Sequence, residues 1–210
     1  MKFYLCYQPC TNAAGSYEKL WVENGGDVPQ AHWAREAIQV LVESKVISGY
    51  NDNTFRGTKQ VNRYELAMIL SSIIKNLPSS VSMQPRSSNM PLEKLWTENG
   101  GDIPNNHWAK DAVQTVLEVG VMYAYENNTF QGEQPVNRYE LAVILHALFT
   151  ALPLSSLEAQ IPKIPFEKLL AENGGDITKE HQAKEAIEFL VKLSILSGYE
   201  DQTFRGEKQI

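Results

Sequence analysis

The sequence predicts an all-α protein built from tandem helical-hairpin repeats. One sequence motif occurs three times, and apolar residues recur at helical spacing around it. The interval from Arg63 to Arg138 and from Asp27 to Asp102 is 75 residues. The motif comprises a turn-rich loop and the start of a helix. The first two copies lie at residues 49–57 with 61–67 and at 125–132 with 136–142, and the third copy has only the loop, at 198–206.

The repeats set the expected domain boundaries. The third copy of the loop is followed by Ile210, where the next Asn-Arg-Tyr-Glu is expected, so we expect this repeat to be incomplete. The linkers are rich in Ser and Pro, which is typical of surface segments. The expected organisation is an N-terminal extension at 1–15, repeat 1 at 16–77, a linker at 78–90, repeat 2 at 91–152, a linker at 153–164 and a truncated repeat 3 at 165–210.

Each repeat is expected to open with a short helical segment, followed by a first amphipathic helix. Paired glycines such as Gly25 and Gly26 end the short segment. Apolar residues at i, i+3, i+4, i+7 and i+8 then predict a buried face on the helix. These residues are Ala34, Ala37, Ile38, Leu41 and Val42 in the first copy, with counterparts from Ala109 to Leu117 and from Ala183 to Val191.

The second helix of each repeat begins with a capping signal. Asn62 precedes an apolar helix and Glu65 follows three residues later, which predicts a capping box. Asn137 and Glu140 repeat the pattern. A hairpin of this size cannot bury its own apolar face, so we expect the copies to pack on one another.

Composition excludes several classes of function. The net charge of -6 and the scattered Lys and Arg argue against a nucleic-acid binder. No apolar run approaches the length of a membrane span, and residues 1–7 are too short for the apolar region of a signal peptide. The spacing of Cys6 and Cys10 lacks a second ligand pair for zinc. No nucleophile elbow, phosphate loop or acid pair is present, so we expect neither an enzyme nor a cofactor.

Three motifs at fixed spacing carry a family resemblance. Asp-Val-x-x-x-His-Trp-Ala, Gly-Tyr-x-Asp-x-Thr-Phe-Arg-Gly and Asn-Arg-Tyr-Glu-Leu-Ala together resemble the S-layer homology (SLH) module, whose usual third motif is Thr-Arg-Ala-Glu. The form seen here is most similar to the cyanobacterial branch. The resemblance implies a pseudo-threefold spindle with the second helices in a central bundle. It also implies a cell-envelope location and grooves that bind cell-wall polysaccharide, often bearing pyruvate ketals.

The resemblance gives the predicted ligand-binding residues. Arg63 and Arg138 lie at helix N-termini, where a guanidinium can bind a carboxylate in bidentate fashion, although either could instead form a salt bridge within the protein. An aromatic face such as that of a tryptophan can stack on a sugar ring or pack between repeats. Glycines in the loops allow the close approach of a ligand, or only a tight turn of the loop itself. On these grounds Trp33, Trp108, Gly49 and Gly198 complete the set of predicted ligand-binding residues.

Two other recurring residue types are weaker signals for a metal. His32, His107 and His181 occupy equivalent positions, but repeat symmetry places equivalent residues apart. Asp52 and Asp201 lie in loops that lack the closing bidentate Glu of a calcium loop. We therefore expect no metal site.

Two functions remain open at this stage. The first is a non-catalytic module that binds cell-wall polysaccharide, with copy one as the most complete copy because it has Trp33, Gly49 and Arg63. The second is a scaffold whose helical surface contacts protein, inside the cell or in a larger complex. Because one central helix is expected to be absent, we also expect a second copy, a protein partner or residues beyond Ile210 to cover the incomplete third repeat.

Overall fold

The computed structural model describes residues 17–78, 83, 91–152 and 164–210. Within these ranges the chain is helical and forms no strands, which confirms the all-α prediction. The predicted N-terminal extension and almost all of the two predicted linkers lie outside the described residues.

The described ranges contain five α-helices and three pairs of short 3-10 helices, in an order that repeats along the chain. The α-helices are α1 (Arg35–Glu43), α2 (Arg63–Lys75), α3 (Lys110–Val119), α4 (Arg138–Ala151) and α5 (Lys184–Lys192). The 3-10 helices are η1 (Tyr17–Leu20), η2 (Val22–Asn24), η3 (Leu92–Leu95), η4 (Thr97–Asn99), η5 (Phe166–Leu169) and η6 (Ala171–Asn173).

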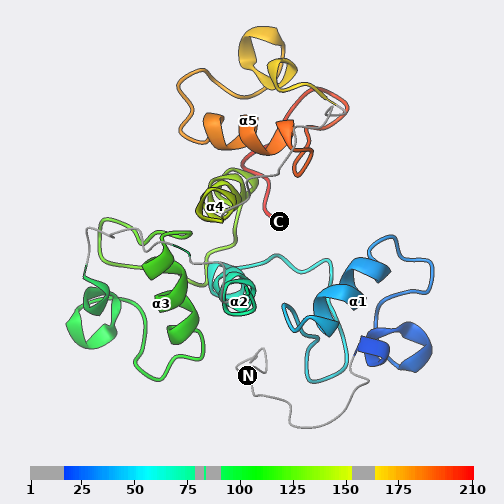
Figure 1. Cartoon of the computed structure of the whole chain (residues 1–210), viewed down its shortest axis with the longest axis vertical. Helices are drawn as coiled ribbons and strands as arrows, with labels where there is room; N and C mark the ends of the chain where they lie inside the picture. Colours follow the sequence, from blue (N-terminus) through cyan, green and yellow to red (C-terminus); the bar gives the residue numbers. More distant parts are fainter. Residues whose placement is uncertain (1–16, 79–82, 84–90, 153–163) are drawn as a thin grey trace.

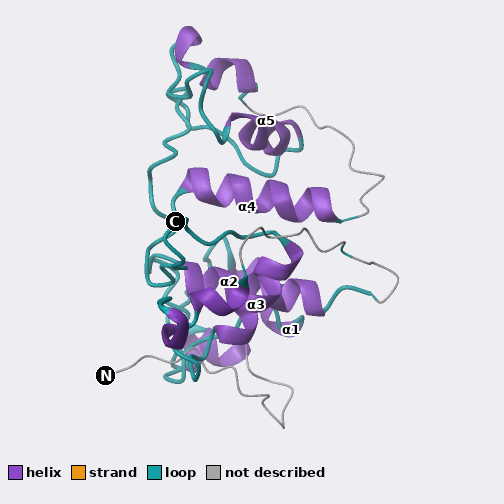
Figure 2. Ribbon diagram, turned by 90° about the vertical axis from the view of Figure 1, so that its left-hand side faces the viewer, coloured by secondary structure: helices purple, strands orange, loops and turns teal. Residues whose placement is uncertain are grey.

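The main helix contacts of α2 and α4 are with the first helix of the following copy. In Figure 1, α2 and α4 lie near the centre, with α3 beside α2 and α5 beside α4. The principal contact of α1 is instead with η1 of its own copy. Figure 2 shows that the loops gather on one side of the molecule, together with the last residue. The copies are therefore interleaved through their second helices.

A ring of backbone hydrogen bonds joins the three copies. The N–H of Val136 donates to the carbonyl of Val61 at 2.9 Å, and the N–H of Ile210 donates to Val136 at 3.0 Å. The N–H of Val61 donates to Ile210 at 2.8 Å and closes the ring. Equivalent residues of three copies can form such a closed ring only around a common axis, which supports the pseudo-threefold arrangement.

An aspartate ties the start of each copy to its loop. The carboxylate of Asp27 accepts the backbone N–H groups of Phe55 and Arg56, at 2.5 and 2.7 Å. Asp102 and Asp176 bind the corresponding loop amides in the same way. Charge-assisted hydrogen bonds of this kind are stronger than neutral ones, so each loop is fixed in position.

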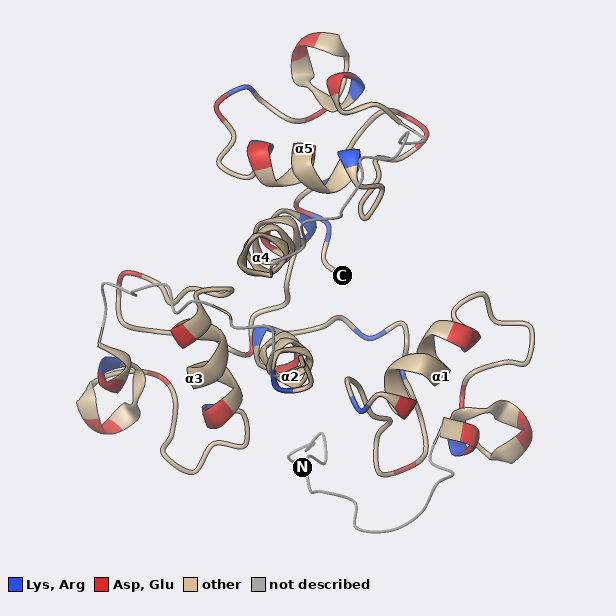
Figure 3. Ribbon diagram, in the orientation of Figure 1, with Lys and Arg blue, Asp and Glu red and all other residues tan. Residues whose placement is uncertain are grey.

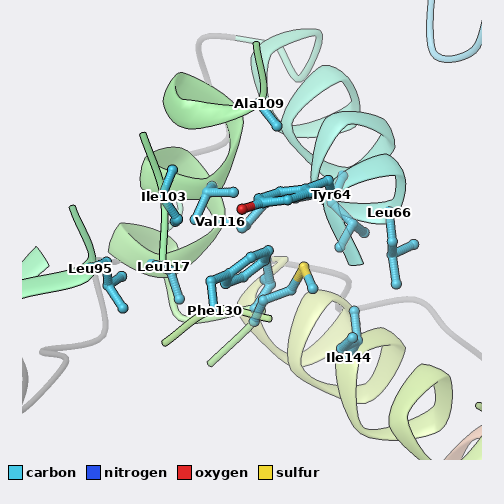
Figure 4. Close-up of a cluster of buried hydrophobic side chains, with 14 of the residues drawn as sticks. Tyr64, Leu66, Leu95, Ile103, Ala109, Val116, Leu117, Phe130 and Ile144 are labelled. Atoms are coloured by element: carbon cyan, nitrogen blue, oxygen red, sulfur yellow. The ribbon is translucent and has the colours of Figure 1, made fainter. Parts of the chain in front are cut away.

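The largest apolar cluster lies where α2 meets the second copy. Figure 4 shows the ring of Tyr64, from α2, between α3 and Phe130 of the following loop. Tyr64 is 4% exposed and Phe130 is fully buried, and their ring centroids are 5.6 Å apart. Tyr139 repeats this contact with Phe204 of the third copy at 5.8 Å. Large aromatic rings contribute much of the buried apolar area, so these contacts hold neighbouring copies together.

Two local predictions need correction. The predicted buried face of the first helix is confirmed only in part in copy one. Ile38 and Val42 are buried, but Ala37 is exposed and Leu41 is 38% exposed, because no described α-helix covers this side of α1. The capping box of Asn62 and Glu65 is confirmed. Asn137 accepts the N–H of Glu140 as expected, but the carboxylate of Glu140 pairs with Arg63, so the reciprocal half of that box is not formed.

The glycine at the end of the loop provides a test of the interleaved packing. A Cβ added at Gly132 would lie 2.1 Å from Cζ of Tyr64, whereas one at Gly57 would lie 3.3 Å from its nearest neighbour, in Phe55. We expect Gly132→Ala to lower the free energy of unfolding by about 1 to 3 kcal/mol through overpacking, and Gly57→Ala to change it by less than about 0.5 kcal/mol. Urea denaturation measures both, and equal losses would contradict the packing described.

Candidate functional site

Arg63 connects α2 to the loop of the second copy. Its side chain donates from Nε to the carbonyl of Phe130 at 2.8 Å and from Nη2 to the carbonyl of Tyr123 at 2.6 Å. Its Nη1 pairs with Glu140. The residue is 4% exposed, and burial lowers the pKa of Arg63. All three nitrogens of the guanidinium are therefore engaged within the protein.

Arg138 repeats this placement with one difference. Its Nε donates to the carbonyl of Phe204 at 2.9 Å and its Nη2 to the carbonyl of Ser197 at 2.8 Å. No carboxylate in the described ranges pairs with it, and its side chain is only partly buried. Both arginines thus anchor a helix to the next copy, and Arg138 is the more accessible. That either one binds a ligand carboxylate stays a prediction.

The two predicted tryptophans lie in different surroundings. Trp108 is partly buried and makes an edge contact with Tyr64, with ring centroids 5.9 Å apart. Trp33 is 91% exposed. Trp108 therefore packs between repeats, as one of the two hypotheses proposed, whereas the ring of Trp33 is open to a partner.

The predicted glycines are accounted for by packing. A Cβ at Gly49 would lie 2.2 Å from Cδ2 of Leu20, and one at Gly198 would lie 2.3 Å from Cδ2 of Leu169. Each glycine therefore allows a leucine of the preceding 3-10 helix to approach the loop. A ligand is not needed to explain either residue.

The recurring histidines act in capping and stacking. The Nδ1 atoms of His32, His107 and His181 accept the backbone N–H two residues later, at 3.1 to 3.3 Å. Tyr64 and Tyr139 stack on the second and third of them, with ring centroids 4.2 and 4.0 Å apart. In the part of the chain that the structure describes, no group of three His, Cys, Asp or Glu residues could hold a metal ion.

Cationic side chains gather around a tyrosine ring in copies one and three. The guanidinium of Arg56 and the Nζ of Lys59 lie 4.2 and 5.6 Å from the centre of the Tyr50 ring. Copy two has glutamines at both equivalent positions, Gln131 and Gln134. The surface formed by Tyr50, Arg56 and Lys59 is called the first loop cluster.

The third copy carries the larger of these surfaces. Arg205 and Lys208 lie 4.3 and 5.2 Å from the centre of the Tyr199 ring, and Arg138 lies 5.1 Å from it. The hydrogen bond from Lys208, followed by these neighbouring charges, lowers the pKa of Tyr199. Tyr199, Arg205, Lys208 and Arg138 form the third loop cluster. Figure 3 shows Lys and Arg gathered where the C-terminal segment passes the start of α4.

Sequence reasoning did not assign the loop clusters to a ligand. Their signal is present, because an Arg follows the loop tyrosine by six residues and a Lys by nine in copies one and three. The shared ring contact becomes visible only when the loop is folded. The turn that Asp52 or Asp201 forms with the following threonine brings the arginine back over the ring.

The groove between α2 and copy two has a different character. A hollow of about 280 Å³ is lined by Tyr64, Asp102, Glu133 and neighbouring loop residues. The described residues that line the hollow therefore include two carboxylates and no cation. An acidic ligand fits this hollow less well than it fits the loop clusters.

Comparison with known proteins follows the repeat pattern. The sequence profile of a family described as the S-layer homology domain matches residues 26–67, 101–142 and 175–210, which is more than half of the chain. The chain belongs to the S-layer homology domain family. Each match spans the loop of one copy, and the first two continue into the second helix. The expected resemblance is thereby confirmed.

The relatives are larger proteins with surface roles in their names. The chain is 26% identical to "Cell surface glycoprotein 1" of Acetivibrio thermocellus, with 78% of this chain and 6% of that protein covered. It is 24% identical to "Cellulosome-anchoring protein" of the same organism, over 73% of this chain and 31% of that protein. "Outer membrane protein SlpA" of Deinococcus radiodurans is 49% identical over 24% of this chain and 4% of its own length.

The chain thus spans less than a third of the length of these relatives. A helix with the length and apolar character needed to cross a membrane does not occur in the described residues.

Substitution of the two helix-start arginines tests their anchoring role. We expect Arg63→Met to lower the free energy of unfolding by about 3 kcal/mol, because Glu140 and two carbonyls lose their donor. We expect Arg138→Met to cost about 1 to 2 kcal/mol, because it leaves no described carboxylate unpaired. Chemical denaturation measures both, with the exposed Lys94→Met as control. A larger loss from Arg138→Met would contradict this assignment.

The turns that Asp52 and Asp201 form in the loops predict a low pKa for both carboxyl groups. Hydrogen bonds from Thr203 and then from Arg205 lower the pKa of Asp201 to about 2, from 3.8, and Asp52 behaves alike. Because the pKa of Asp201 is lower in the folded state, ionised Asp201 stabilises the fold. This stabilisation is complete above the ordinary pKa of 3.8 and is lost as the pH falls through about 2. Carboxyl carbon chemical shifts should show this titration, and Thr203→Val should move it upward. A value near 3.8 in the unchanged protein would exclude the turn.

Proposed function

We propose that this chain anchors protein to the cell envelope by binding an acidic cell-wall polysaccharide, with a pyruvylated glycan as the expected form. Membership of the S-layer homology family and the anchoring and surface roles in the relatives' names support a cell-wall anchoring role. We infer that the chain acts without catalysis, in the periplasm or at the cell surface.

The observation that carries the proposal is the pair of loop clusters. Each places a guanidinium and an ammonium beside a tyrosine ring, in copies one and three. An aromatic face packs on the apolar side of a sugar ring, and a guanidinium binds a carboxylate in a bidentate manner. The two elements together fit a sugar that carries a carboxylate.

The loop arginines are accessible to such a ligand. The side chains of Arg56 and Arg205 are 31% and 48% exposed, and each pairs with an aspartate four residues earlier. Exposed ion pairs contribute only about 0 to 1 kcal/mol, so a ligand carboxylate can compete with the aspartate. The buried Arg63 offers no such opening. We therefore still expect copy one to bind the polysaccharide more strongly than copy two, but through Arg56 of the loop rather than through Arg63.

Substitution in the loops tests the proposal. Copy two already has Gln131, so Arg205→Gln and Arg56→Gln reproduce a residue that the fold accepts. We expect each variant to bind cell-wall sacculi about five- to tenfold more weakly, which corresponds to about 1 to 1.4 kcal/mol for a charge-assisted contact. The double variant should lose more, and Gln131→Arg should bind more tightly. Co-sedimentation at several salt concentrations measures the affinities.

The matched control is Lys168→Gln, which removes one exposed charge that belongs to neither loop cluster. Sacculi stripped of acidic polysaccharide should bind none of the proteins. If stripped sacculi bind equally well, or if the loop variants and Lys168→Gln behave alike, the polysaccharide proposal is wrong and the scaffold hypothesis gains support.

A further inference from the structure

The hollow beside α2 contains a tyrosine hydroxyl that the fold itself does not use. Tyr64 is 4% exposed, and a Cβ at Gly132 would lie 2.1 Å from its Cζ, so the hydroxyl end of the ring lies close to the lining of the hollow. Figure 4 shows the hydroxyl oxygen directed away from α2. No described residue forms a hydrogen bond with this hydroxyl, and no buried polar side-chain atom in the described ranges lacks a partner. The hydroxyl therefore opens into the hollow, where a ligand can reach it.

Two carboxylates line the same hollow and act on that hydroxyl. Each oxygen of Asp102 accepts a backbone N–H of the loop at 2.7 Å. Glu133 is exposed, and its Oε2 accepts one neutral hydrogen bond, from Nδ2 of Asn62 at 3.1 Å. Burial, followed by the charges of Asp102 and Glu133, raises the pKa of Tyr64 to about 12. The hydroxyl is therefore protonated at neutral pH, and its oxygen can accept a further hydrogen bond.

Positive charge does not neutralise these carboxylates. No Lys, Arg or His in the described ranges forms an ion pair with Asp102 or Glu133. Arg63 interacts with Asp102 through its charge, but it is buried and already paired with Glu140. The remaining side chains of the lining are amides, because copy two has glutamines where the loop clusters have an arginine and a lysine. The hollow is therefore negative and open to a cation.

Copy three shows what distinguishes copy two. Tyr139, Asp176 and Glu207 occupy the equivalent places, and burial, followed by the charges of both carboxylates, again raises the pKa of the tyrosine. There, however, Arg205 and Lys208 replace the two glutamines. Among the described copies, the combination of the tyrosine, both carboxylates and no loop cation therefore occurs in copy two alone.

We propose that this hollow binds a protonated primary amine. An ammonium group donates three hydrogen bonds and accepts none, and the lining offers three acceptors: the carboxylates of Asp102 and Glu133 and the hydroxyl oxygen of Tyr64. A calcium ion needs at least six oxygen ligands at about 2.3 to 2.6 Å, and no group of three His, Cys, Asp or Glu residues in the described ranges could hold a metal. The volume of about 280 Å³ leaves room for the carbon skeleton that carries the amine.

Two kinds of molecule carry such an amine. One is an amino sugar that lacks its N-acetyl group, and the other is a diamino acid with a free side-chain amine. The shared ammonium is what the lining recognises. The proposal does not depend on the binding of acidic polysaccharide by the loop clusters.

Nuclear magnetic resonance of the intact chain with glucosamine is the direct test. Glucosamine should shift the backbone amide signals of Gln131 and Glu133, with a dissociation constant on the order of 1 to 10 mM, as expected for about twelve non-hydrogen atoms. N-acetylglucosamine keeps the sugar ring without the charge and should leave these signals in place. Nα-acetyl-lysine amide carries the same charge on a flexible chain, so the ratio of the two affinities distinguishes an amino sugar from a diamino acid as the source.

Matched substitutions test the two kinds of acceptor. Glu133→Gln should weaken glucosamine binding at least fivefold, because it removes one of the two charges. Glu207→Gln is the control, since each of these glutamates accepts one hydrogen bond from a capping Asn at 3.1 Å, and it should bind normally. Tyr64→Phe should keep the midpoint of thermal unfolding, because the hydroxyl has no described partner, and yet bind glucosamine at least threefold more weakly.

Exchange of residues between copies separates this proposal from the polysaccharide proposal. Arg205→Gln together with Lys208→Gln gives copy three the lining of copy two and should create a second amine site, detected at the amide of Glu207. Gln131→Arg together with Gln134→Lys should abolish the site in copy two. Sacculus binding by these variants tests the acidic polysaccharide, whereas glucosamine binding tests the amine site.

Three outcomes would overturn the proposal. The first is that glucosamine leaves the signals of Gln131 and Glu133 in place at about 50 mM, well above the expected dissociation constant. The second is that N-acetylglucosamine shifts them equally, or that Glu133→Gln and Glu207→Gln bind alike. The third is that calcium alone shifts them while both amines do not, which would make the hollow a metal site.

Discussion

The fold depends on the insertion of two side chains, an Arg and a Tyr, into the loop of the following copy. Arg63 binds loop carbonyls and Tyr64 packs on Phe130, and both are almost fully buried. The backbone N–H groups of Arg63 and Tyr64 also donate to loop carbonyls of the second copy, so side chains and backbone together direct α2 to that copy. The glycine at the end of the loop makes room for the tyrosine, so the partners fit each other in shape as well as in hydrogen bonding.

The interleaving determines where stability and accessibility lie. In a repeat protein, each unit is stabilised mainly by its neighbours. Here α3 and α5 each receive a helix from the preceding copy, while α1 rests mainly on η1. The same packing buries Arg63 and leaves the loop arginines Arg56 and Arg205 at the surface. Arg138 combines both settings, because it anchors α4 to the third copy and also lies beside the ring of Tyr199.

Much of this architecture follows from the sequence. The helical period, the caps and the repeat length predict the α-helices and the need for packing between copies, because these are local signals. The choice of neighbour could not be predicted, since every first helix has the same apolar pattern. Arg63 was predicted to bind a ligand because a guanidinium at a helix start can bind a carboxylate. Only the fold shows that the carboxylate paired with Arg63 is that of Glu140. The loop clusters depend on a turn that brings distant cations onto one ring.

Native-state hydrogen exchange tests the interleaved packing most directly. The account predicts that amides of α2 and α3 share one opening free energy, that amides of α4 and α5 share another, and that amides of α1 exchange at a lower free energy than either pair. The contradicting result is that amides of α1 and α2 exchange with one common opening free energy that differs from that of α3. In that case α2 would be stabilised mainly by its own copy, and the interleaved packing would be wrong.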